Sequence, residues 1–234
     1  MDRTVYQVIL VGFLAALNPV GADAGKNQYP NMAPLEMYLS ASQSAEIALA
    51  RSAALASISD KAEIRVLGAH GYETAVKGTN GFVCYVARSW DNDVDNAEFW
   101  NPKLRAPMCL NPAAVRSYLP LYLQRTQWVL SGASRAEMID RTKAAIAAKQ
   151  IKAPEAGAMG FMLSKDGYLG DSAAGPWHPH VMFWGPPVAG AEWGADVPGS
   201  PVVSAPSDLL PLTMFFVPVR KWSDGTLATY VHEE

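Results

Sequence analysis

The chain has few charged residues and no basic run. Only 18% of its 234 residues are charged, and 19 Lys and Arg stand against 22 Asp and Glu, for a formal net charge of -3. A protein that binds nucleic acid needs concentrated positive charge to neutralise backbone phosphates. We therefore expect no nucleic-acid partner. Low charge combined with 50% hydrophobic residues is typical of a compact globular chain rather than a disordered one.

Long hydrophobic runs are also scarce. The most marked run covers residues 5–17 and is shorter than the roughly 20 apolar residues that a membrane-spanning helix needs, so we expect no integral membrane association. It follows Arg3 and precedes an Ala-Asp-Ala segment at 22–24, a pattern typical of a signal-peptidase site. The sequence therefore predicts a signal peptide over residues 1–24 and a periplasmic or secreted protein. The alternative is an N-terminal core element, which Asp2 favours because it offsets the charge of Arg3.

Cysteine is limited to Cys84 and Cys109. In an oxidising compartment such a pair is most simply a disulfide bond, which stabilises a fold mainly by restricting the unfolded chain. The alternative starts from Cys109, which lies just before a predicted helix start at Asn111. A helix N-terminus lowers the pKa of a nearby thiol and favours a nucleophilic thiolate. A disulfide bond would remove that sulfur from such chemistry.

The remaining chain divides into a short leader and one domain. Residues 25–34 are polar and contain prolines, which is typical of a flexible leader, and residues 35–234 are long enough for a single domain with one core. The domain begins with an Ala-rich segment in which apolar residues recur at helical spacing. These residues are Ile47, Ala50, Ala54, Leu55 and Ile58.

Short alternating runs predict a mainly antiparallel sheet. Three runs at 64–69, 72–77 and 82–87 are separated by glycine-bearing turns and predict a three-stranded meander. Later candidate strands lie at 159–164, 180–184, 212–217 and 227–231. We expect five to seven strands in all, an estimate from such runs.

The middle of the chain predicts a helical hairpin. Asn111 is a helix cap before a proline, and Pro120 must kink or split the helix that follows because it lacks an amide hydrogen. Ser134 and Glu137 have the spacing of a capping box, which starts a second helix. With the Ala-rich helix, these helices are expected on one side of the sheet. The fold class predicted is α+β.

Two of the four histidines occur in a Trp-His-Pro-His segment, as His178 and His180. Residues two apart in an extended segment point to the same face, so both imidazoles could bind one divalent transition metal ion such as zinc. The alternative is one hydrogen-bonded histidine in a buried corner and one solvated histidine. A metal site would need a further ligand, for which the candidates are His70, Glu73, Asp166 and Asp171. We assign Asp171 the role of orienting carboxylate or catalytic base.

The acidic run at 91–96 begins as a calcium-binding loop does, but Pro102 stands where such a loop needs a bidentate glutamate. We interpret the run as a solvated acidic loop.

Two functional hypotheses follow from these patterns. The first is a metal-dependent enzyme that acts on a small molecule through the His-x-His segment. The second starts from the last third of the chain, which is rich in tryptophan and proline. It is a non-catalytic module that binds a ligand or a partner in the cell envelope through these loops.

Overall fold

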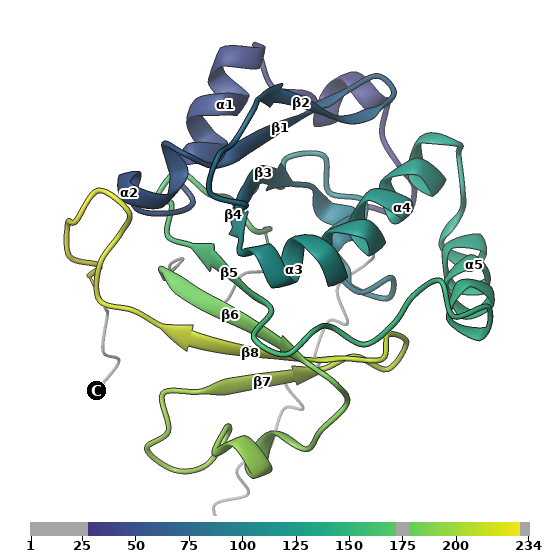
Figure 1. The fold of residues 1–234 in the computed structure, drawn as a ribbon. Coiled ribbons are helices and arrows are strands. Elements are labelled where there is room, and N and C mark those ends of the chain that lie inside the picture. Colours follow the sequence, from purple (N-terminus) through teal and green to yellow (C-terminus); the bar gives the residue numbers. More distant parts are fainter. Residues whose placement is uncertain (1–27, 172–177, 230–234) are drawn as a thin grey trace, which may run out of the picture.

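A computed structural model describes residues 28–171 and 178–229 of the chain. The predicted signal peptide and the first residues of the predicted leader lie outside this range. The described residues form an eight-stranded sheet with the strand order β2-β1-β3-β4-β5-β6-β8-β7 (Figure 1). All neighbouring strands are antiparallel except β1 and β3, so the predicted α+β class with a mainly antiparallel sheet is confirmed.

The elements have the following bounds. The strands are β1 (Glu63–Gly68), β2 (Gly71–Val76), β3 (Val83–Ala87), β4 (Ala106–Leu110), β5 (Met159–Met162), β6 (His180–Gly185), β7 (Val203–Pro206) and β8 (Thr213–Pro218). The α-helices are α1 (Gln43–Arg51), α2 (Ala56–Ser59), α3 (Pro112–Ser117), α4 (Leu119–Leu130) and α5 (Arg135–Ala147). Short 3-10 helices are η1 (Leu35–Tyr38), η2 (Ser89–Asp91) and η3 (Gly190–Trp193).

The first three strands do not form the predicted meander. β3 pairs with β1 and runs parallel to it, with Val83 opposite Glu63, while β2 lies at the edge of the sheet. The loop after β2 crosses the chain that enters β1, where the Thr79 amide donates to the Lys61 carbonyl at 2.7 Å. A Cβ atom on Gly78 would lie 2.1 Å from the Glu63 nitrogen, so only glycine fits this crossing. The glycines between residues 78 and 81, which suggested a hairpin turn, belong instead to this crossing connection.

The predicted disulfide bond between Cys84 and Cys109 is confirmed. The two residues lie directly opposite each other on β3 and β4, with their Cα atoms 3.9 Å apart. Both are fully buried in a cluster with small residues of the first helical segment, including Ala50 and Ala53. The small alanine side chains let α1 lie close to this face of the sheet.

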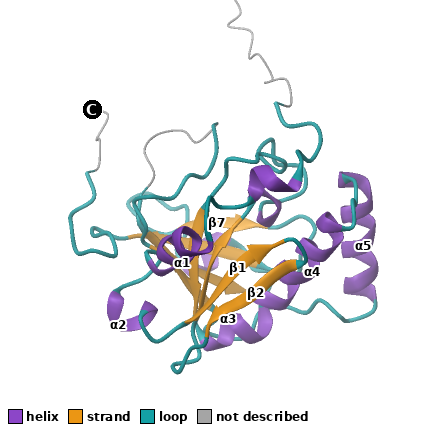
Figure 2. Cartoon of the chain, turned by 90° about the horizontal axis from the view of Figure 1, so that it is seen from above, coloured by secondary structure: helices purple, strands orange, loops and turns teal. Residues whose placement is uncertain are grey.

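Helices cover both faces of the central strands, not one face as the sequence suggested. Every residue of β3 and β4 is buried, and side chains alternate between the two faces of a strand. Cys84 faces the α1 side, whereas Tyr85 belongs to the larger core that includes residues of α3 and α4. Both faces therefore need cover, and Figure 2 shows α1 and α3 on opposite sides of the strands.

The helical hairpin follows its sequence signals. The Asn111 side chain accepts a hydrogen bond from the Ala114 amide at 2.9 Å and caps α3. Pro120 separates α3 from α4, and both hydrogen bonds of the predicted capping box between Ser134 and Glu137 are present at the start of α5. Within the described ranges, no helix combines the length and apolarity needed to cross a bilayer.

The later strands were predicted in part. The runs at 159–164, 180–184 and 212–217 correspond to β5, β6 and β8, and β4 and β7 were missed. In the described part of the run at 227–231, Leu227 makes an isolated bridge to Lys221. β4 was not predicted because it contains Pro107, and proline has no amide hydrogen to donate to a neighbouring strand. Its position is tolerated because β5 pairs with β4 at Cys109 and Leu110 but not at Pro107.

Candidate functional site

A cavity of about 460 Å³ lies over the half of the sheet formed by β4 to β8. Its lining residues Met108, Tyr118 and Met182 belong to the larger core that α3 and α4 cover, so it lies on the same face of the sheet as these helices. Its walls are the loop after β3, the end of α3 and the loop between β7 and β8. Residues of these walls include Asp91, Asp93, Tyr118, Ser207 and Leu210.

Four methionines, one from each of four strands, line the floor of the cavity. They are Met108 of β4, Met162 of β5, Met182 of β6 and Met214 of β8. The sheet register puts them on one face, since residues directly opposite or two apart share a face. Methionine has an unbranched, polarisable side chain that adapts its shape to different partners. The floor is therefore apolar and able to adapt.

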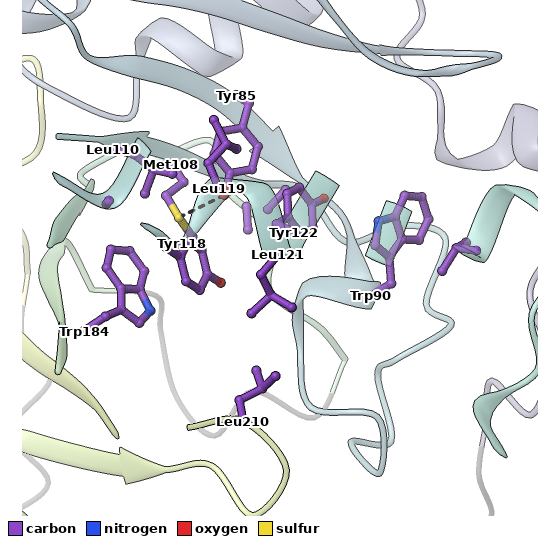
Figure 3. Packing of buried hydrophobic residues seen from close by; sticks show 14 of the residues in the cluster. Tyr85, Trp90, Met108, Leu110, Tyr118, Leu119, Leu121, Tyr122, Trp184 and Leu210 are labelled. Atoms are coloured by element: carbon purple, nitrogen blue, oxygen red, sulfur yellow. Dashed lines mark hydrogen bonds between the residues drawn. The ribbon is translucent and has the colours of Figure 1, made fainter. Parts of the chain in front are cut away.

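Aromatic and aliphatic groups continue this apolar surface. Tyr118 stacks on Trp184 with ring centroids 4.3 Å apart, and the Tyr85 hydroxyl contacts the Met108 sulfur at 3.4 Å. Figure 3 shows Tyr118, Met108 and Trp184 together, with Leu210 reaching toward them from the loop after β7. A tryptophan beside the cavity provides a natural fluorescent reporter for binding.

One end of the cavity is acidic. Asp91, Asp93 and Glu98 all line it, and the Tyr118 hydroxyl donates a hydrogen bond to Asp91 Oδ1 at 2.8 Å. Burial raises the pKa of Asp91 to about 6, against the opposing effects of Arg125 and the Tyr118 hydroxyl. Burial likewise raises the pKa of Asp93. The interpretation of 91–96 as a simple solvated loop is therefore wrong for Asp91, which is half-buried in a cavity wall.

The positive charge at this end is already engaged. Arg88 is the only Lys or Arg among the described residues that line the cavity, and it is fully buried. Its guanidinium donates to both carboxylate oxygens of Glu46 and, through Nε, to the Tyr38 carbonyl at 2.7 Å. The charge of Arg88 is thus balanced by Glu46 and does not neutralise the acidic end.

His180 of β6 also lines the cavity. Its ring meets the Phe216 ring edge to face at 5.6 Å, and its Nδ1 lies 2.9 Å from the His178 carbonyl oxygen. A carbonyl only accepts hydrogen bonds, so this contact assigns the proton to Nδ1. Burial lowers the pKa of His180, which favours the neutral ring at pH 7. His178 is half-buried and is not among the described residues that line the cavity.

The structure does not bring the predicted metal ligands together. His70 and Glu73 are exposed on the β1–β2 hairpin, whereas His178 and His180 lie at the start of β6. β2 and β6 are separated by five inter-strand spacings of about 4.8 Å each. Asp166 is exposed in the turn after β5. Across residues 28–171 and 178–229, no group of three or more His, Cys, Asp or Glu side chains is placed to hold a metal ion.

Asp171 lies on the surface and joins two segments of the chain. Its carboxylate accepts hydrogen bonds from the hydroxyls of Tyr168 and Tyr29 and lies 3.5 Å from the Lys103 ammonium. The Tyr168 hydrogen bond is the main cause of a lowered pKa of Asp171, with a further contribution from Tyr29. A lowered pKa makes a carboxylate a weaker base. This geometry favours a tether for the segment around Tyr29 over the catalytic role predicted for Asp171.

Sequence reasoning missed the methionine floor and the part played by Asp91. The alternation of His180, Met182 and Trp184 on one strand face was visible in the sequence, but the pairing of β6 with β5 and β8 was not. No local pattern marked Asp91 as a cavity residue, because its environment comes from Tyr118, 27 residues further along the chain.

Comparison with known proteins supplies no relative for this site. No family model, curated protein or solved structure matches the chain. The cavity is therefore interpreted from its own geometry.

Proposed function

We propose that the protein is a non-catalytic binding protein that holds a small, largely apolar molecule in the cavity over β4 to β8. The single observation that carries this proposal is a cavity of about 460 Å³ with a methionine floor and a few polar groups at one end. Ligand sites are typically apolar clefts of about 300–1,000 Å³ with a small number of placed polar groups. The methionines suit a binding role because they adapt to more than one ligand shape.

The alternative of a metal-dependent enzyme has less support. A catalytic zinc site usually has three protein ligands and an open position. Of the residues proposed as ligands, His178 and His180 lie close together. His70 and Glu73 lie at the β2 edge of the sheet, five strands away from β6. A zinc site at the two histidines would need a third ligand that the described residues do not place there, so we expect no stoichiometric zinc in the purified protein.

We also propose a periplasmic or secreted location. The bond between Cys84 and Cys109 supports it, since structural disulfides persist mainly in oxidising compartments.

Ligand binding can be tested with a neutral apolar dye and a cavity-filling variant. N-phenyl-1-naphthylamine, whose emission rises in apolar surroundings, is titrated into the wild-type protein and into Ala205→Trp. Ala205 lies on the edge strand β7 and lines the cavity. The matched control is Ala191→Trp, which adds the same indole at an exposed alanine of η3.

We expect saturable binding with one site per chain for the wild type and for the control, and at least tenfold weaker binding for Ala205→Trp. Circular dichroism of each variant checks that the fold is retained. Absence of binding by the wild type, or equal binding by Ala205→Trp and the control, would overturn the proposal.

A further inference from the structure

We propose that the ligand of this cavity is an amphipathic amine, whose ammonium group pairs with the carboxylate of Asp91 while its apolar body lies on the methionine floor. This inference rests on the proposed binding function and adds the chemical class of the ligand. It follows from the arrangement of charge and hydrogen bonds at the acidic end of the cavity.

Asp91 has an acceptor available for a ligand. Its Oδ1 accepts the Tyr118 hydroxyl hydrogen, and within the described part of the chain its Oδ2 accepts no hydrogen bond. Tyr118 is held in place by its stacking on Trp184, so the carboxylate is positioned by a fixed partner. An ammonium group carries three donors and could use the second oxygen.

The remaining acidic groups reinforce this preference. Asp93 and Glu98 line the same end, and the Glu98 carboxylate accepts a hydrogen bond from Asn101 at 2.6 Å. Arg88 contributes no excess positive charge because Glu46 binds its guanidinium. Arg125 lies nearby and donates to the Asn92 carbonyl at 2.5 Å, but it does not line the cavity. Arg125 offsets part of the charge of Asp91 and Asp93, but the described lining still holds three carboxylates against one arginine, which Glu46 already pairs.

The class of ligand follows from what each alternative would cost. A carboxylate ligand would lie in a cavity lined by three like charges, of which Arg125 offsets a part. A neutral ligand without a donor would cover Asp91 and leave its carboxylate unsatisfied, and a neutral hydroxyl would supply a hydrogen bond but no opposite charge. A protonated amine supplies both the opposite charge and the hydrogen-bond donors. The apolar floor requires that the rest of this molecule be hydrophobic.

Several groups determine how Asp91 titrates in such a test. The charged and titratable groups that interact with Asp91 or line the same cavity come from β2, β3, the loop after β3, the turn before α4, α4 and β6. They are Tyr72, Tyr85, Arg88, Asp93, Glu98, Tyr118, Tyr122, Arg125 and His180. Burial is the strongest influence and raises the pKa of Asp91 to about 6.

The test compares three probes that share one apolar body and differ in charge. 4-Phenylbutylamine, 4-phenylbutanol and 4-phenylbutyrate are titrated calorimetrically into the full chain at pH 7.5 and low salt, where charge interactions are least screened. We expect the amine to bind at least tenfold more tightly than the alcohol, and the carboxylate to bind more weakly than both. Lowering the pH to 5 should remove most of the preference for the amine, because Asp91 is then protonated.

The isosteric variant Asp91→Asn removes the charge and keeps the acceptor for Tyr118. In this variant the amine should lose most of its advantage, because only Asp93 and Glu98 remain, while the affinity for the alcohol changes by less than twofold. The matched control is Asp140→Asn, which removes an exposed carboxylate of α5 away from the cavity and should keep the full preference.

The outcomes separate the two proposals. Binding of the alcohol with no advantage for the amine, or an advantage that survives in Asp91→Asn, would overturn the inference and leave the binding function intact. Failure of all three probes to bind would overturn the proposed function, and the inference would fall with it.

Discussion

Glu46 of α1 and Arg88, which follows β3, form an ion pair that is closed off from solvent. Arg88 Nη2 lies 2.8 Å and 2.7 Å from the two carboxylate oxygens of Glu46. Arg88 is 0% exposed and Glu46 is 1% exposed. Glu46 also accepts the Leu67 amide at 3.2 Å, so the pair connects α1, β1 and the wall of the cavity. Because Glu46 pairs with Arg88, the one Lys or Arg among the described residues that line the cavity does not neutralise the acidic wall.

The buried pair should be costly to break and less costly to replace. Arg88→Met leaves the Glu46 carboxylate buried without its partner, and we expect it to lower the free energy of unfolding by about 3–5 kcal/mol. The double variant Arg88→Met/Glu46→Met removes both charges and should recover a large part of that loss. Urea unfolding of the wild type, both single variants and the double variant measures the coupling. Additive losses would contradict this account.

The disulfide bond should contribute mainly by restricting the unfolded chain. Cys84 and Cys109 are 25 residues apart, which corresponds to about 3.5 kcal/mol in the loop-entropy estimate. We expect Cys84→Ala/Cys109→Ala to lose roughly this much stability in urea. Reductant should weaken the wild type and leave the double variant unchanged. A mass increase of about two hydrogens on reduction of the wild type confirms the bond, whereas two free thiols in the untreated protein would exclude it.

Asp91 should make stability fall as the pH rises through mildly acidic values. Its pKa is raised from 3.8 to about 6 in the folded protein, chiefly by burial. Between these values the folded state binds more protons than the unfolded state, so the free energy of unfolding decreases with pH, by at most about 3 kcal/mol. Above about pH 6 the contribution is constant.

The measurement is the difference in the free energy of unfolding between the wild type and Asp91→Asn at pH 4, 5, 6 and 7. The contributions of the other titrating groups cancel in this difference. We expect the variant to become more stable than the wild type as the pH approaches 7. A difference that does not change with pH would show that Asp91 titrates normally.

A substitution of Asp171 tests whether this residue anchors the segment around Tyr29 or acts as a catalytic group. Asp171→Asn weakens the hydrogen bonds from Tyr29 and Tyr168 and removes the charge opposite Lys103. We expect faster amide hydrogen exchange in the segment around Tyr29, with global stability lowered by less than about 1 kcal/mol because the site is exposed. Dye binding in the cavity should be unchanged. Unaltered exchange in that segment would argue against the tether.

The sequence was informative where structure is determined locally. The capping box of Ser134 and the helix break at Pro120 depend on residues nearby in the sequence, and both were predicted. The disulfide bond was also predicted, because the chain has only two cysteines. The parallel pairing of β3 with β1 was not predictable, since glycine at position 78 has the same local meaning in a turn and in a chain crossing. The fold class could therefore be predicted, but not the strand order.

The candidate site depends on that strand order. Met108 and Met182 lie in segments 70 residues apart and meet only because β4, β5 and β6 are neighbours in the sheet. The same order separates His70 from His180, although both lie at the same end of their strands. The local sequence pattern predicts neither the contact of the two methionine segments nor the separation of the two histidines.

His178 and His180 should not hold zinc in the purified protein. Two histidines alone make a weak chelate, and no third His, Cys, Asp or Glu side chain among the described residues is placed to complete the site. We expect the protein, purified without a histidine tag and dialysed, to contain less than about 0.1 zinc per chain, well below the full occupancy of a strong structural site. Elemental analysis of the wild type and of His178→Ala/His180→Ala provides the measurement. One zinc ion per wild-type chain that is lost in the double variant would contradict this expectation and favour the metal-dependent enzyme.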